Sequence, residues 1–141
     1  MRKSRRRAEQ LEDAQMTFAL WSLFIAMWLP LIWAVAAKWG LRNYDNSAPR
    51  KWLERQEGFR QRAAWAQSNA WEAFAQFAAA VLTAHYLGAN QTWANGLAAV
   101  FVVARIFHGV FYCINRPMLR SIAWTIGLSA VTGLFVAAAL A

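Results

Sequence analysis

Cysteine and charged residues are scarce in this sequence. Cys113 is the only cysteine in 141 residues, which excludes an internal disulfide, a CxxC redox pair and a cysteine-rich metal site. Charged residues make up 16% of the chain, against about 25% in a typical soluble domain, and hydrophobic residues make up 59%. The sequence also offers no serine–histidine–aspartate set, phosphate-cradling loop or metal-ligand cluster. These absences argue against hydrolase, kinase and metalloenzyme functions.

Basic residues are confined to blocks. Of the 15 Lys and Arg residues, five lie within residues 1–7 and seven within residues 38–62. A nucleic-acid-binding domain gathers its basic residues on one face, whereas basic blocks between long apolar runs are typical of polytopic membrane proteins. We therefore expect no nucleic-acid partner. The simplest partner of the N-terminal block is anionic membrane lipid.

Four apolar segments are long enough to cross a bilayer, which takes about 20 residues. Residues 16–37 carry no charge, and Pro30 predicts a kink within them. The sequence LGANQT at residues 87–92 divides a long uncharged stretch, and a further turn is expected at residues 115–117. These features predict an all-α integral membrane protein, a four-transmembrane-helix bundle with spans at about 16–37, 64–87, 93–114 and 121–141.

The connections between the spans give conflicting signals about topology. Residues 38–64 are polar, and residues 50–57 predict a short interfacial helix. The first and third connections together carry nine Lys and Arg, and the opposite side carries five. The positive-inside rule therefore favours cytoplasmic first and third connections, whereas the basic N-terminus argues for the reverse.

Ionisable side chains inside the spans are functional candidates, because each costs several kcal/mol in lipid unless it is paired or hydrated. Glu72 is the only acid within the spans and Arg105 the only base. Helical spacing groups the polar candidates into three sets, one on each of the last three spans: Asn69, Glu72 and Gln76; Arg105, His108 and Tyr112, which Arg116 extends; and Arg120, Ser121 and Trp124. All three sets lie toward the same membrane surface, and we expect them to form one polar pocket.

Simpler interpretations of these residues remain open. Glu72 and Arg105 can form a structural ion pair between two helices. His108 can be a packing residue, and Tyr112 and Trp124 can belong to an interfacial aromatic belt. The arginines next to the fourth span can extend to lipid headgroups. If the pocket forms, its cations, donors and single carboxylate suit an anionic, zwitterionic ligand or a thiolate.

These polar positions resemble those of the MAPEG family, the membrane-associated proteins in eicosanoid and glutathione metabolism. The resemblance is carried, within residues 60–130, by three ordered motifs: Arg62-x6-Asn69-x2-Glu72-x4-Phe77, Arg105-x2-His108-x3-Tyr112 and Arg116-Pro117-x2-Arg120-Ser121-x2-Trp124. It implies one membrane domain over residues 1–141, assembled as a homotrimer. Bacterial-type members look most similar, which implies the cell inner membrane as the location.

The same resemblance implies a function. Glutathione would be the cosubstrate, bound between neighbouring subunits, and the activity would be that of a transferase or peroxidase acting on lipophilic small molecules. Arg120 would stabilise the glutathione thiolate, with Ser121 beside it. The residues implied to bind glutathione are Asn69, Glu72, Arg105, His108, Tyr112, Arg116 and Trp124.

Three positions differ from the family pattern. Family members often carry basic residues one and four positions before the asparagine of the second helix, and this chain has Ser68 and Trp65 there. Trp124 stands where glutathione-binding members often have tyrosine. These differences favour an alternative, a non-catalytic membrane or lipid-binding protein with the MAPEG fold. A small proton-coupled exporter using Glu72 fits less well, because such exporters place their key acid in the first helix.

Overall fold

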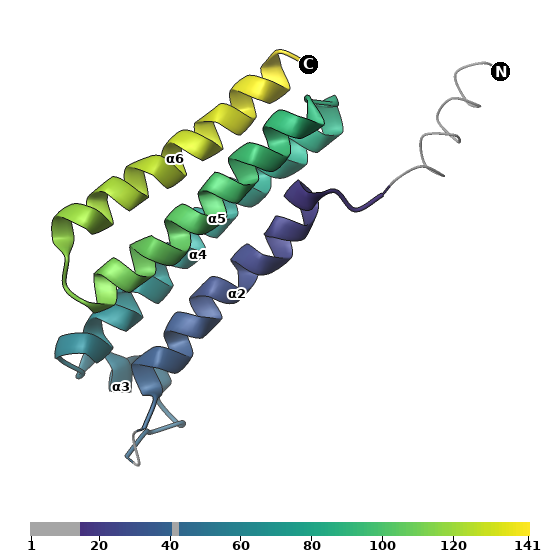
Figure 1. The fold of residues 1–141 in the computed structure, drawn as a ribbon. Coiled ribbons are helices and arrows are strands. Elements are labelled where there is room, and N and C mark those ends of the chain that lie inside the picture. Colours follow the sequence, from purple (N-terminus) through teal and green to yellow (C-terminus); the bar gives the residue numbers. More distant parts are fainter. Residues whose placement is uncertain (1–14, 41–42) are drawn as a thin grey trace.

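The computed structural model describes residues 15–40 and 43–141, and these residues form four long helices and one short one. Figure 1 shows the long helices side by side, with the short helix at the end of the bundle where the first long helix ends. The predicted lipid contact of residues 1–7 lies outside the described residues. The helices are α2 (Phe18–Lys38), α3 (Pro49–Glu54), α4 (Gly58–Leu87), α5 (Gln91–Cys113) and α6 (Pro117–Ala139).

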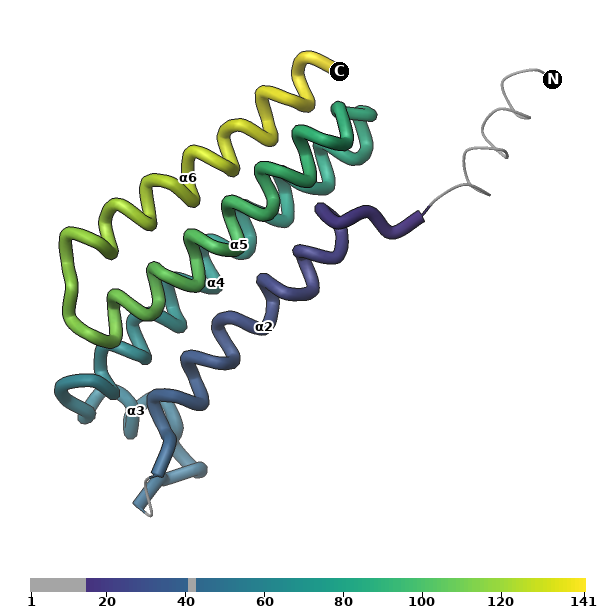
Figure 2. The backbone as a smooth tube through the Cα atoms, viewed as in Figure 1, coloured from purple at the N-terminus to yellow at the C-terminus, as the bar shows by residue number. Residues whose placement is uncertain are grey.

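Local sequence sets where the long helices begin and end. Thr17 and Asn90 cap the starts of α2 and α5 with side-chain oxygens that accept backbone N–H groups. Gly88 ends α4 in the left-handed conformation, with φ of 75°. Pro117 opens α6 at a position where its missing N–H is not needed. Both predicted turns are therefore confirmed, and Figure 2 shows them at opposite ends of the bundle.

The start of α4 is the largest departure from the predicted spans. This helix begins at Gly58 rather than near residue 64, so it has 30 residues and is about 45 Å long at 1.5 Å per residue. Two arginines of its first turns anchor it to other helix ends. Arg60 donates a hydrogen bond to the backbone oxygen of Trp39, and Arg62 donates one to the backbone oxygen of Cys113, both at 3.1 Å. These contacts order the polar residues at the start of α4.

The connection before α4 is held in place by aromatic contacts. Trp52 of α3 is buried and donates a hydrogen bond to the backbone oxygen of Asn43 at 3.1 Å. The ring of Tyr44 packs edge-on against the Trp52 ring, with the centroids 5.0 Å apart. Hydrogen bonds from the Ser47 side chain and backbone lower the pKa of Asp45 below its ordinary value. The interfacial helix predicted at residues 50–57 is thus α3, which ends at Glu54.

The outer surface that α2, α5 and α6 form is apolar. Among the described residues, the helices α2, α5 and α6 are long and apolar enough to cross a membrane. Large hydrophobic side chains such as Phe24, Val103 and Ile126 are exposed on these helices, which a soluble protein would bury. The remaining long helix, α4, packs along the other three and carries more polar residues than they do. The chain is a multi-pass integral membrane protein, as predicted.

Small residues let the helices approach one another closely. Alanine supplies many of the buried positions, and the rings of Phe77 and Phe101 stack between α4 and α5 with centroids 3.9 Å apart. Between α2 and α5, Gly109 leaves room for the indole ring of Trp33, which an added Cβ would overlap. Such small-residue contacts are the usual basis of helix packing in membranes.

Candidate functional site

A hydrogen-bond network joins α4 to α5 through Arg105. This side chain is 4% exposed, and its Nη2 donates to the side-chain oxygen of Asn69 at 2.7 Å and to the Asn69 backbone oxygen at 3.2 Å. Asn69 in turn donates from Nδ2 to Glu72 at 3.4 Å. Both hydrogen bonds of Arg105 go to Asn69, so the side-chain amide of Asn69 lies between Arg105 and Glu72. The ion pair considered from the sequence is therefore indirect.

Glu72 lies on the outer side of this network. Its side chain is exposed in the single chain, and so is Gln76 one turn further along α4. An exposed carboxylate and amide on a membrane helix cost several kcal/mol if they face lipid. This face of α4 is therefore suited to contact with polar groups or with another chain rather than with acyl chains.

A second cluster surrounds the ring of Tyr112. The guanidinium carbon of Arg120 lies 4.5 Å from the centroid of this ring, and His108 packs edge-on with its centroid 5.5 Å away. Trp65 approaches from α4, with its ring centroid 6.4 Å from that of Tyr112. A cation–π contact uses none of the N–H donors of Arg120, so these donors can serve an anion.

The structure brings together six of the nine predicted site residues. The two clusters share α4 and α5, and His108 of the second cluster is one turn from Arg105 of the first. The residues that these clusters contain are Asn69, Glu72, Arg105, His108, Tyr112 and Arg120. Side chains from the last three spans thus lie near one another in two clusters, and the single polar pocket expected from the sequence stays a prediction.

The other three predicted residues point elsewhere. Because α5 ends at Cys113, Arg116 lies in the turn before α6 and is exposed, so the prediction that it extends the Arg105 face is wrong. Ser121 and Trp124 are exposed on α6. Within one chain they contact none of the clustered side chains in any hydrogen bond or ring contact that the structure describes. They can join the site only from the outer surface of the bundle.

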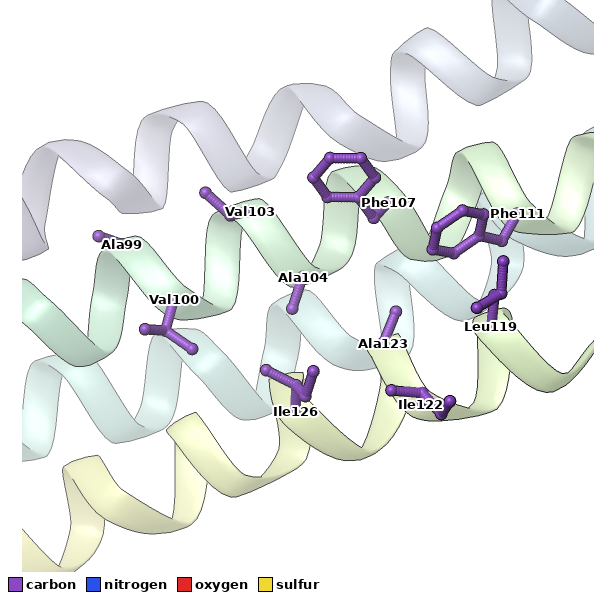
Figure 3. Close-up of a pocket in the computed structure, with 10 residues that line it drawn as sticks. All are labelled: Ala99, Val100, Val103, Ala104, Phe107, Phe111, Leu119, Ile122, Ala123 and Ile126. Atoms are coloured by element: carbon purple, nitrogen blue, oxygen red, sulfur yellow. The ribbon is translucent and has the colours of Figure 1, made fainter.

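Two cavities of about 550 Å³ each flank the clusters. One is an apolar groove between α5 and α6, where Figure 3 shows Phe111 of α5 next to Leu119 of α6. None of the nine predicted site residues lines this groove, so it brings no polar partner to a ligand. The second cavity lies between α3 and α4, is mixed in polarity and includes Trp65 in its wall.

Two contacts were not expected from the sequence. The sequence analysis predicts no contact for Trp65, which differs from the family pattern, yet its ring packs against Tyr112. Its spacing of four residues before Asn69 places both on one helix face, and this signal could have identified it. The hydrogen bond from Arg62 to the Cys113 backbone had no sequence signal, because it depends on where α5 ends.

Comparison with known proteins gives one match. The model of the MAPEG family matches residues 18–140, which include α2 to α6 and both clusters. No curated protein and no solved structure gives a significant match to the chain. The family's four-helix membrane bundle is the architecture described above.

Proposed function

The chain belongs to the MAPEG family, and on this premise we propose that it is a membrane enzyme that uses glutathione as a cosubstrate. The proposed activity is transfer of glutathione to lipophilic electrophiles, or reduction of lipophilic peroxides by glutathione. The observation that carries the proposal is the position of Arg120 at the start of α6. Its guanidinium lies over the ring of Tyr112 on α5, and the buried His108 packs against the same ring.

Glutathione has two carboxylates, one ammonium group and one thiol. In the proposed complex the exposed carboxylate of Glu72 binds the ammonium group of glutathione. The side-chain amide of Asn69, next to Glu72, forms a further hydrogen bond to the same end of glutathione. Arg116, exposed in the turn before α6, binds a carboxylate. Arg105 holds Asn69 in position through its two hydrogen bonds. His108, Tyr112 and Trp124 complete the walls.

Arg120 is proposed to lower the pKa of the bound thiol. A permanent positive charge beside the sulfur favours the thiolate over the thiol, and the start of α6 adds the positive end of a helix dipole. The thiol proton leaves to solvent, and the sulfur electron pair then forms a bond to the electrophilic carbon. The electron pair of the broken bond leaves with the departing group. Ser121 donates a hydrogen bond to the thiolate in this proposal.

The site is proposed to be completed in a homotrimer. Glu72 and Gln76 are exposed on a membrane-spanning helix, and the small residues Ala75 and Ala79 lie exposed between and beside them. Small residues next to polar ones are typical of helix–helix contacts in membranes. A neighbouring subunit on this face would cover the polar side chains and close the glutathione site. A bacterial-type member in the cell inner membrane remains a prediction.

One observation favours the non-catalytic alternative. Trp65 and Ser68 take the places where family members often have basic residues, and both line the cavity between α3 and α4. A chain that lacks these two cations binds the carboxylates of glutathione less well. The alternative function is then that of a membrane protein that binds lipid and keeps only the family's fold.

Equilibrium binding of glutathione to the purified protein in detergent distinguishes the two functions. We expect saturable binding by the unchanged protein, and binding weakened about tenfold in Arg120→Ala, since a hydrogen bond to a charged group contributes about 1.5–3 kcal/mol. Arg55→Ala, which removes an exposed arginine at the end of α3, serves as the matched control and should bind as the unchanged protein does. Absence of saturable binding would leave the non-catalytic alternative.

A further inference from the structure

The guanidinium of Arg120 is positioned by the ring of Tyr112. The guanidinium carbon lies 4.5 Å from the centroid of that ring. Within residues 15–40 and 43–141, the structure shows no hydrogen bond from the Arg120 side chain and no ion pair to it. An arginine side chain has many rotamers, and here a single contact selects among them. The place of this charge therefore depends on the place of the Tyr112 ring.

The Tyr112 ring lies close to the end of its own helix. Tyr112 is the last residue but one of α5, and its side chain is half-buried. His108 packs edge-on against the ring from one turn earlier, but it belongs to the same helix and moves with it. Among the ring contacts that the structure describes, Trp65 gives the one that comes from another helix. Trp65 is thus the aromatic group that holds the Tyr112 ring in place relative to α4.

Trp65 lies on a well-anchored part of α4. Its ring centroid is 6.4 Å from that of Tyr112, with the two planes at 57°, which is within the range of favourable aromatic pairs. Three residues earlier, Arg62 donates a hydrogen bond at 3.1 Å to the backbone oxygen of Cys113, the residue after Tyr112. The next residue after Trp65, Ala66, is fully buried. The backbone that carries the indole is therefore fixed to the end of α5, where the Tyr112 ring lies.

Trp65 contributes little to the core of the bundle. Its side chain is 49% exposed, and the hydrophobic clusters that the structure describes do not include it. Packing of the core is therefore a weak reason for a tryptophan at this position. An indole also carries no charge, so it cannot bind a carboxylate as a cation would. The contribution that the structure does show is the aromatic contact with Tyr112.

We propose that Trp65 is a positioning residue. Its ring holds the ring of Tyr112 against Arg120, and so keeps the guanidinium beside the thiol of bound glutathione. Trp65 acts through Tyr112 and binds no charged group of the cosubstrate. The chemistry rests on the proposed glutathione-dependent function, whereas the contacts that lead from Trp65 to Arg120 are present without a ligand.

Titration of the bound thiol tests this role. The ultraviolet absorbance of the thiolate, measured against pH in detergent at saturating glutathione, gives the pKa of the bound thiol. In Trp65→Leu we expect this pKa to rise by about one unit, because a cation that leaves its place no longer stabilises the thiolate. A residue that only stabilised the fold would not change the pKa of a thiol bound to folded protein.

Two further variants separate the aromatic contact from general packing. Trp65→Phe keeps a ring against Tyr112 and should bring the pKa of the thiol most of the way back. Trp28→Leu is the matched control, because Trp28 is 47% exposed and packs on one ring, that of Phe24, with the centroids 6.1 Å apart. This variant removes a similar indole from α2, outside the cluster around Tyr112, and should leave the pKa of the bound thiol unchanged.

A double-mutant cycle tests the same contacts without glutathione. The double variant of Trp65→Leu and Arg120→Ala should lose less in unfolding temperature than the two single variants together, because both residues act on one ring. Additive losses would overturn the proposal, as would an unchanged thiol pKa in Trp65→Leu, an equal shift in Trp28→Leu or no recovery in Trp65→Phe. If no glutathione binds, the glutathione-dependent function fails, and the cycle alone decides whether Trp65 positions Arg120.

Discussion

Arg105 of α5 donates two hydrogen bonds to a single residue of α4, Asn69: one to the side-chain oxygen at 2.7 Å and one to the backbone oxygen at 3.2 Å. The guanidinium is buried inside a membrane bundle, where an unsatisfied charge is costly. Asn69 therefore fixes both the position of the charge and the packing of the two helices. Because Asn69 also donates to Glu72, a change at this residue affects the acid and the base together.

We expect Asn69→Ala to destabilise the protein by about 1.5–3 kcal/mol, the contribution of hydrogen bonds to a charged group. Asn69→Asp keeps an acceptor for Arg105 and should be less destabilising. Thermal unfolding in detergent, followed by helical circular dichroism, measures the difference. Ser129→Ala, at an exposed position of α6, is the control and should change stability by less than about 0.5 kcal/mol. Equal stability of Asn69→Ala and Ser129→Ala would show that the network contributes nothing.

The contact of Gly109 with Trp33 predicts opposite effects at two glycines of α5. Gly109→Ala should destabilise by about 1–3 kcal/mol, because the new Cβ overlaps the indole ring and α2 must move. Gly96→Ala meets nothing within 4 Å and should stabilise the helix by up to about 1 kcal/mol. Unfolding temperatures of the two variants test this pair. A Trp33→Ala background should remove most of the Gly109→Ala effect, and an unchanged effect there would show that the ring is not its cause.

The fold was predictable because two strong signals agree. Uncharged segments of about 20 residues identify membrane spans, and Gly88 and Pro117 mark where helices end and begin. The start of α4 was not predictable from hydropathy. Its first turns are polar, and Arg60 and Arg62 are ordered there only because the ends of α2 and α5 present backbone oxygens to them.

The connections between α2 and α4 and between α5 and α6 are predicted to be cytoplasmic, because together they carry nine of the fourteen Lys and Arg outside the predicted spans. Asn46→Cys, at an exposed position of the connection between α2 and α4, should then resist an impermeant thiol reagent applied to intact cells. Thr92→Cys, exposed at the other end of the bundle, should react. The native Cys113 is buried and gives little background. Labelling at position 46 and not at 92 would show that the N-terminal basic block sets the orientation.

The exposed face of α4 predicts the oligomeric state. Native mass spectrometry in mild detergent should show three copies of the 16.0 kDa chain. Ala75→Trp, which adds bulk to this face, should reduce the trimer, whereas Leu128→Trp on the exposed surface of α6 should leave it intact. A monomer as the only species of the unchanged protein would contradict the trimer, and with it the closed form of the glutathione site.

The candidate site was predictable only in part. Spacing of three and four residues correctly grouped Asn69 with Glu72, and Arg105 with His108, because these positions lie inside regular helices. The same reasoning failed for Arg116, since the helix that would carry it ends at Cys113. The packing of Trp65 on Tyr112 depends on the distance between α4 and α5, which small buried residues set and which no local pattern encodes.

Glutathione-dependent turnover of Arg120 variants tests the central claim most directly. Shifting the pKa of a bound thiol by one unit takes ~1.4 kcal/mol, and the same free energy in a barrier is tenfold in rate. The rate of conjugation of a lipophilic aryl halide, per folded protein in detergent, should fall at least about tenfold in Arg120→Ala. Arg120→Lys should lose only part of the rate, because lysine keeps the charge but not the planar set of donors. Turnover of folded Arg120→Ala equal to that of the unchanged protein would contradict the account and remove Arg120 from the mechanism.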